Sequence, residues 1–165
     1  MNTKWNALVL GAAMVGQFGA AAWAGNAAQE VRVEAPYVRA VPPGTPNTGG
    51  FMVLKNSGSS AHAVVSGRSS ASQHVELHTH RMEGGMMKMR PIEKIEIPAG
   101  GETVLKPGDL HVMFINLVSE LKEGQEVGFT LVFEDGSETM VMAPVKKVME
   151  GMKMGEGMGH GKKMH

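Results

Sequence analysis

Residues 74–80 read HVELHTH, and residues 110–115 read LHVMFI. In the first stretch Val75 and Leu77 alternate with polar residues, and in the second Leu110, Val112 and Phe114 alternate with His111, Met113 and Ile115. Because successive side chains of a β-strand point to opposite faces, the alternation predicts two strands that each bury one face. In the first strand we expect Val75 and Leu77 to face the core, and the residues facing outward to be His74, Glu76, His78 and His80.

The β pattern extends from residue 31 to about residue 148. Further strands are expected at 31–38, 50–55, from 63 onward, at 127–133 and at 139–145, with turns rich in Pro, Gly, Asn and Asp between them. The mature part of the chain shows no long helical period, and residues 25–30 are expected to be a flexible start. Many short strands separated by frequent turns indicate a single all-β domain, a sandwich or barrel.

The composition excludes several classes of function. The chain has 165 residues with 16 basic and 16 acidic side chains, so it lacks the basic surface that nucleic-acid binding requires. It contains no cysteine, which excludes disulfides and also a blue-copper electron-transfer site, since that site needs a Cys thiolate. Neither a GxSxG nor an HExxH pattern occurs, and we do not expect an enzyme.

Residues 1–24 have the features of a secretory signal peptide. Lys4 supplies a positive charge, a mostly apolar run follows from Ala7, and Ala22-Trp23-Ala24 fits a cleavage site of small residues. Cleavage would leave a mature chain beginning at Gly25, exported most simply to a bacterial periplasm. No cysteine follows this site, so we expect neither a lipid anchor nor stable membrane insertion after cleavage.

Two histidines and two methionines form a candidate metal site on these strands and the segment between them. His78 is followed by ten residues and Met89, then by 21 residues and His111, and after one more residue by Met113. His111 and Met113 share a strand face, about 6.6 Å apart along the strand. Thioether sulfur is a soft, neutral ligand and imidazole a borderline one, which favours Cu(I), whereas Mg²⁺ and Ca²⁺ prefer oxygen ligands.

Other methionines surround this candidate site. A single methionine on a strand is usually a core residue, and we expect this of Met87. The additional presence of Met82, Met86, Met87 and His80 leaves open which residues of the region bind a metal.

The end of the chain has a different composition. From Met149 onward the last seventeen residues are only Met, Gly, Lys, His and Glu, so this tail is expected to be disordered without a metal. Its donors suggest a second copper site for Cu(I) or Cu(II), or a route to the main site; a functionless solvated terminus is the alternative. Secondary ligand candidates are His80, Met152, Met154, Met158, His160, Met164 and His165.

Taken together, these motifs resemble those of the PCuAC family of bacterial periplasmic copper chaperones. That family carries the pattern of His, ten residues, Met, 21 residues, His, one residue and Met, and the present sequence meets it without a gap. The flanking segments are similar as well: YVRAVPP from Tyr37, then VELH, MKMRP and IPAGGETVLKPGDLHVM. The resemblance covers about residues 31–145.

The resemblance implies a cupredoxin-like Greek-key β-sandwich with a solvent-accessible Cu(I) site at His78, Met89, His111 and Met113. It also implies delivery of copper toward the binuclear copper site of cytochrome c oxidase, through an oxidase subunit or its assembly factors. His80 occupies a variable position of the motif, where a methionine can also be found, so its role as a ligand stays open.

A periplasmic copper storage or resistance protein would use the same ligands without a dedicated recipient, and only transfer to a partner separates the two functions. An exported β-sandwich that binds another protein is a further alternative, against which the spacing and the tail both argue. We expect a monomer with a signal peptide at 1–24, a copper-binding domain at 25–148 and a metal-binding tail at 149–165.

Overall fold

The computed structural model describes residues 25–147, so the expected signal peptide and the expected tail from residue 149 lie outside the described residues. Within this range no helix is long and apolar enough to span a membrane. The elements are helix α1 (Ala27–Glu30) and strands β1 (Val31–Arg39), β2 (Thr48–Asn56), β3 (His62–Ser69), β4 (Ser72–Glu83), β5 (Met86–Pro91), β6 (Ile95–Ile97), β7 (Glu102–Leu105), β8 (His111–Leu117), β9 (Glu126–Phe133) and β10 (Glu138–Lys146).

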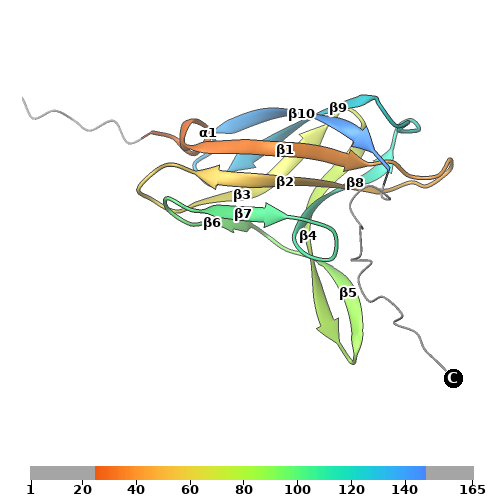
Figure 1. The fold of residues 1–165 in the computed structure, drawn as a ribbon, viewed down its shortest axis with the longest axis horizontal. Coiled ribbons are helices and arrows are strands. Elements are labelled where there is room, and N and C mark those ends of the chain that lie inside the picture. The colour runs from red at the N-terminus through yellow and green to blue at the C-terminus, as the bar shows by residue number, and fades with distance from the viewer. Residues whose placement is uncertain (1–24, 148–165) are drawn as a thin grey trace, which may run out of the picture.

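The strands form one sheet that curls into a barrel (Figure 1). Its order is β5-β4-β8-β2-β1-β10-β9-β3-β6, with β7 paired to β2. The pairs are antiparallel except β1 with β10, which is parallel at Val38 and Val145. A further pairing of β3 with β4, at Gly67 and Val75, closes the barrel. The structure therefore confirms the expected all-β architecture.

The alternating stretches are strands β4 and β8, and their apolar positions face the barrel interior as expected. Leu77 on β4 is buried, as are Val112 and Phe114 on β8. Phe114 and Phe129 meet edge-on inside the barrel with ring centroids 5.3 Å apart. This packing orients both strands, because burying one face of a strand directs the alternate side chains to the other face.

Strand β4 is shared between the barrel and a projecting hairpin. Its first half pairs with β8 and its second half with β5, and the two pairings meet at His78, which lies opposite His111 on β8 and Pro91 on β5. The hairpin turns at Gly84 and Gly85, whose positive φ angles of 60° and 78° suit glycine. Figure 1 shows the hairpin extending beyond the barrel wall.

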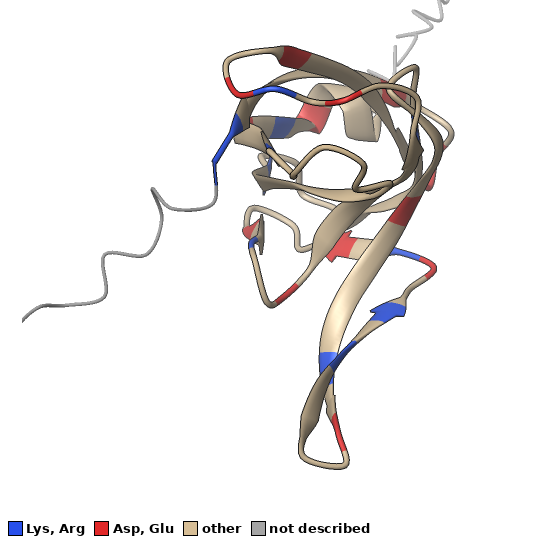
Figure 2. Ribbon diagram, turned by 90° about the vertical axis from the view of Figure 1, so that its right-hand side faces the viewer, with Lys and Arg blue, Asp and Glu red and all other residues tan. Residues whose placement is uncertain are grey.

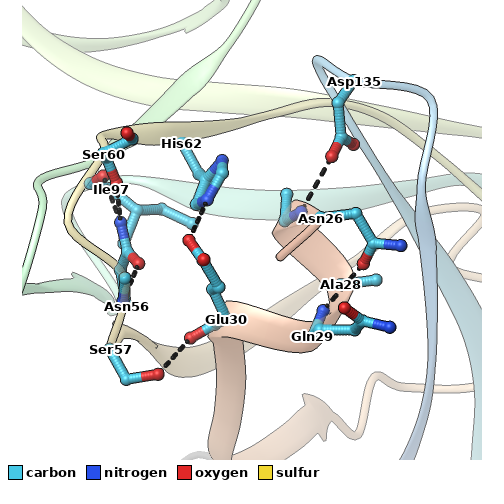
Figure 3. A network of polar contacts seen from close by, with 12 residues as sticks. Asn26, Ala28, Gln29, Glu30, Asn56, Ser57, Ser60, His62, Ile97 and Asp135 are labelled. Atoms are coloured by element: carbon cyan, nitrogen blue, oxygen red, sulfur yellow. Dashed lines mark hydrogen bonds and ion pairs between the residues drawn. The ribbon is translucent and has the colours of Figure 1, made fainter. Parts of the chain in front are cut away.

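The start of the described chain is a capped helical turn, so the expectation of a flexible start at 25–30 is wrong. The Asn26 side chain accepts a hydrogen bond from the backbone N–H of Gln29, and the Asp135 carboxylate accepts one from the N–H of Ala27 (Figure 3). A four-residue helix is too short to be stable alone. Its conformation therefore depends on contact with the turn between β9 and β10. The local sequence around residues 25–30 does not predict this contact.

His62 connects this helical turn to the barrel. Its Nε2 lies 2.9 Å from Glu30 Oε2 (Figure 3), and its Nδ1 lies 2.7 Å from Glu134 Oε1. The hydrogen bonds to Glu30 and then to Glu134 raise the pKa of His62, although its burial opposes this. An imidazolium donates from both nitrogens, which matches two carboxylate acceptors.

A His62→Gln variant is therefore expected to lose more stability in mildly acidic than in alkaline solution. The folded-state pKa of His62 lies above its unfolded value of 6.5, so its stabilisation is fully present below pH 6.5 and is lost as the pH rises through the folded pKa. We expect a loss of about 1.5–3 kcal/mol near pH 5.5, as for hydrogen bonds to charged groups, and a smaller loss near pH 9. Urea unfolding at both pH values measures it.

The control for this prediction is His74→Gln, because His74 is exposed on β4. Its effect should stay within about 0.5 kcal/mol at either pH. The measurements avoid strongly acidic solution, where Glu134 and the neighbouring Asp135, whose pKa values are both lowered, would themselves protonate. Equal losses for His62→Gln at both pH values would contradict the role of the imidazolium.

Candidate metal centre

The predicted ligands lie on three neighbouring strands, β5, β4 and β8. His78 is directly opposite His111, and Met89 is directly opposite His80. Met113 follows two residues after His111 on the same side of β8. Because directly opposed residues share a face of the sheet, all five project from one side, the side opposite to the core.

Loops cover part of this face and enclose a cavity of about 230 Å³. Three of the four predicted ligands, Met89, His111 and Met113, line it together with the secondary candidate His80. His78 does not line the cavity but lies beside it, with its ring centroid 5.8 Å from that of His111. The loops contribute Val41, Asn47, Pro107 and Gly108.

His111 offers an unpartnered ring nitrogen at this place. The residue is 2% exposed, and its Nδ1 is 2.8 Å from the carbonyl oxygen of Asp109. A carbonyl only accepts hydrogen bonds, so Nδ1 carries the hydrogen when the imidazole is neutral, and Nε2 keeps its lone pair. Nε2 is buried without a hydrogen-bond partner. This is costly for a polar atom in a folded protein, but it is the state that a metal ligand needs.

The surroundings of His111 favour its neutral form. Burial is the main cause that lowers the pKa of His111, and nearby His80, His78 and Arg39 lower it further, while the hydrogen bond to Asp109 opposes the shift. Metals bind the neutral imidazole. At neutral pH His111 can therefore bind an ion without first losing a proton.

His78 shows the same arrangement with its ring nitrogens exchanged. Its Nε2 is 2.8 Å from Glu76 Oε2, and its Nδ1 is buried without a partner. A carboxylate that fixes the ring of a histidine is common behind metal ligands. His78 lies on the predicted face of β4. It is only 9% exposed, however, so the expectation that this side chain is solvent-accessible is wrong. The reason is that His111 and Pro91 flank it.

Phe51 of β2 and Arg39 of β1 also line the cavity, and Tyr37 of β1 packs against Phe51. Phe51 is buried, with its ring 6.1 Å from that of His111 and 5.1 Å from that of Tyr37. Tyr37 reaches this position after a register shift in β1. The guanidinium of Arg39 lies over Phe51 at 5.7 Å. We had not predicted these site residues, although Tyr37 and Arg39 belong to the quoted YVRAVPP segment.

Gly49 is a further site residue that alternation does not reveal. It lies directly opposite Met113 and lines the cavity. A Cβ atom on residue 49 would lie 2.9 Å from Phe51 Cζ, closer than such atoms normally approach. The absence of a side chain therefore leaves room between β2 and β8.

The donors present fit a soft ion. Within residues 25–147 no three or more His, Cys, Asp or Glu side chains are grouped so that they could hold a metal. An ion at the cavity would therefore depend on the sulfur atoms of Met89 and Met113 beside imidazole nitrogen. That combination suits Cu(I) and not Mg²⁺ or Ca²⁺.

The remaining methionines of this region lie on the projecting hairpin. Met82 is 68% exposed, Met86 62% and Met87 54%, so the expectation that Met87 belongs to the core is wrong. The reason is topological, since β5 pairs only with the half of β4 that extends beyond β8. The candidate ligands of the tail lie outside the described residues.

Comparisons with known proteins agree with this fold and these motifs. Residues 31–145 match the family described as "Putative lipoprotein LpqE-like". The chain is also 37% identical over 123 residues to Lxx21020 of Leifsonia xyli subsp. xyli, which bears the same lipoprotein designation, and the match covers 74% of this chain and 73% of that protein.

Three solved structures share the fold. Apo-DR1885 from Deinococcus radiodurans is 33% identical, with 92% of this chain and all of that chain covered and a TM-score of 0.58. The Cu(I) form of DR1885 is 34% identical over 76% of this chain and 85% of that chain, with a TM-score of 0.61. A copper-bound PCuAC domain from PmoF2 has a TM-score of 0.63 over 74% of this chain and 97% of that chain; at 22% identity it supports the fold alone.

These likenesses confirm the cupredoxin-like β-sandwich that the motifs led us to expect. The family match spans most of the described barrel, from the first strand to the last. The chain therefore belongs to the LpqE-like family, the family of the PCuAC domains.

Proposed function

We propose that this protein is a periplasmic copper chaperone that binds Cu(I) between β5, β4 and β8. The observation that carries the proposal is the buried, unpartnered Nε2 of His111, on a residue that shares a cavity wall with Met89 and Met113. His78, whose Nδ1 is also buried and unpartnered, is the fourth proposed ligand. His80, which lines the cavity, is the alternative.

The relatives support copper as the cargo. The structures of DR1885 and PmoF2 include a Cu(I) form and a copper-bound form. The lipoprotein designation of the relatives supports an exported protein of the cell envelope. The recipient, a subunit or assembly factor of cytochrome c oxidase, rests on the resemblance of the motifs to those of copper chaperones.

The proposed site suits transfer because its ligands are neutral and its mouth is open. Release of Cu(I) from thioether and imidazole needs no thiolate to be displaced or protonated. Met89 is 41% exposed, so a recipient's ligand can approach the ion while Met89 leaves it. The nearby guanidinium of Arg39 disfavours a bound cation, which keeps the affinity below that of an anionic site.

A copper chaperone differs from a copper storage protein in that it transfers copper directly to a recipient protein. We expect the full chain, loaded anaerobically with one equivalent of Cu(I), to deliver copper to a soluble copper-accepting domain of cytochrome c oxidase. The rate should rise with acceptor concentration and exceed spontaneous release to a Cu(I) chelator by about tenfold or more, because direct ligand exchange avoids free Cu(I). A rate equal to spontaneous release at all acceptor concentrations would favour storage.

Filling the cavity should weaken copper binding. A Gly49→Ala variant places a methyl group against Phe51 and is expected to lower Cu(I) affinity about tenfold, with an unfolding cost of about 1–3 kcal/mol from overpacking. Chelator competition and urea unfolding measure the two effects.

The matched control is Gly128→Ala on β9. Its added Cβ would lie 3.2 Å from the flexible side-chain sulfur of Met142, so it tests the same change on another strand and should leave copper affinity unchanged. Wild-type affinity in Gly49→Ala would argue against the cavity as the binding place.

A further inference from the structure

The β4–β5 hairpin carries further metal donors on the same face as the cavity ligands. Together with His80 and Met89 they form a row of donors that leads away from the cavity. Met82 is directly opposite Met87, two residues further along each strand from the His80 and Met89 pair. Because side chains two residues apart share a strand face, the Met82 and Met87 pair lies on the face that carries His80 and Met89. The row thus runs from the cavity to the end of the hairpin.

The two methionines do not contribute to the barrel core. Met82 and Met87 are 68% and 54% exposed, and neither belongs to the buried cluster of the barrel. The other face of the hairpin is charged, where Glu83 pairs with Arg90 and Lys88. Figure 2 shows basic segments along the hairpin and an acidic one near its end. The hairpin therefore has a charged face and a face of soft donors.

The register brings two thioethers within reach of one ion. Directly opposed residues of antiparallel strands have Cβ atoms about 4.5–5.5 Å apart, and methionine has three rotatable bonds with which to adapt. We propose that Met82 and Met87 form a second, weaker Cu(I) site, through which the ion enters and leaves the cavity. Thioethers alone select a soft monovalent ion, so the site would take Cu(I) and not Cu(II).

The spacing of the row suits a relay. The Met82 and Met87 pair lies two residues, or about 6.6 Å along the strands, from the His80 and Met89 pair. An ion would cover this distance in one transfer between the two pairs. The ion remains Cu(I) throughout, because each step exchanges one neutral donor for another without electron or proton transfer. The relay role rests on the proposed function, whereas binding of Cu(I) by the methionine pair does not.

Binding at the pair can be tested residue by residue in the full chain. The protein would be labelled with ¹³C at the methionine methyl groups and titrated anaerobically with the acetonitrile complex of Cu(I). We expect the Met89 and Met113 signals to shift with the first equivalent, and those of Met82 and Met87 to shift together with further copper. Unshifted Met82 and Met87 signals at several equivalents would overturn the proposal.

Met86 provides the matched control, because it is as exposed as its neighbours but lies on the charged face, opposite Glu83. Its signal should not follow those of Met82 and Met87. Met140 and Met142 provide a second control, since they are an exposed pair on β10, 75% and 51% exposed. Equal shifts in all these methionines would show unspecific binding to exposed sulfur and would refute the site.

The relay is tested by the rate of loading. A Met82→Leu, Met87→Leu variant should fill the cavity from a Cu(I)–chelator complex several-fold more slowly, with unchanged final affinity of the cavity site. Met86→Leu should load at the wild-type rate. Equal rates in all three proteins would refute the relay.

Failure of the inference and failure of the proposed function can be told apart. If the Met82 and Met87 signals shift while those of Met89 and Met113 do not, the hairpin site stands and the cavity site falls. The reverse pattern removes the hairpin site and leaves the chaperone proposal intact.

Discussion

A His111→Ala, Met113→Leu double variant is expected to lose Cu(I) binding at the cavity, with an affinity reduced about 100-fold or more. Even residues behind metal ligands typically contribute 10–100-fold to affinity, and this change removes two proposed ligands at once. A 100-fold loss corresponds to about 2.8 kcal/mol of binding free energy. Anaerobic competition with a Cu(I) chelator measures it.

The same variant should remain folded. Nε2 of His111 is buried and unpartnered, so removing the imidazole removes a polar group that the apo protein holds at a cost. Met113→Leu is close to a volume-conserving change, for which the expected loss is below about 1.5 kcal/mol. Loss of copper binding can therefore be separated from unfolding by urea denaturation of the apo protein.

The control for the double variant is His74→Ala combined with Met140→Leu, two exposed positions on β4 and β10. It removes the same two kinds of donor and should keep wild-type affinity. Unchanged affinity in the His111 and Met113 variant would contradict the site. Copper would then have to bind elsewhere, such as the tail from Met149, and storage would become the better interpretation.

A Phe114→Ala variant is expected to lower the free energy of unfolding by about 3–5 kcal/mol. Phe114 is fully buried and meets Phe129 edge-on at 5.3 Å, and its ring also fills the space above Gly50, where a Cβ would lie 2.8 Å from it. Domains are commonly stable by about 5–15 kcal/mol, so the loss is a large share of the total. Urea unfolding of the apo protein measures it.

This change also tests the coupling between core and site. Cu(I) that binds the folded form should restabilise the variant by about 2.7 kcal/mol at 100 times the variant's own dissociation constant. Because the inward packing of Phe114 directs the preceding Met113 to the opposite face of β8, that dissociation constant should be higher than in the wild type. Val118→Ala, exposed just after β8, is the control and should change stability by less than about 0.5 kcal/mol. A loss below about 1 kcal/mol in Phe114→Ala would contradict the central place of this ring.

Local patterns predicted the strands and their faces well. The alternation of residues 74–80 correctly predicted that Leu77 faces the core, because a period of two is a property of the strand itself. Val112 and Phe114, which alternate with His111 and Met113, are buried as well. The same reasoning failed for Met87 and for the burial of His78. Whether a strand face is covered depends on which elements lie over it, and the alternation is identical in either case.

Contacts between distant segments were beyond prediction from sequence patterns. The helical turn at 27–30 exists because Asp135 and His62 hold it, and these residues are far from it in the sequence. Likewise, the hydrogen bond from His111 Nδ1 to the carbonyl of Asp109 leaves Nε2 as the nitrogen that is free to bind a metal. The residue types alone do not predict which of the two nitrogens is free.

The sequence by itself determined the chemistry of the donors and the faces of the strands, because side-chain softness and a period of two are local properties. Tertiary structure decided which donors meet. The register of β4 with β8 and β5 brings Met89, His111 and Met113 to one cavity with His80 and sets His78 beside it. Register depends on hydrogen bonds between separate segments and on core packing, so it follows only from the folded chain.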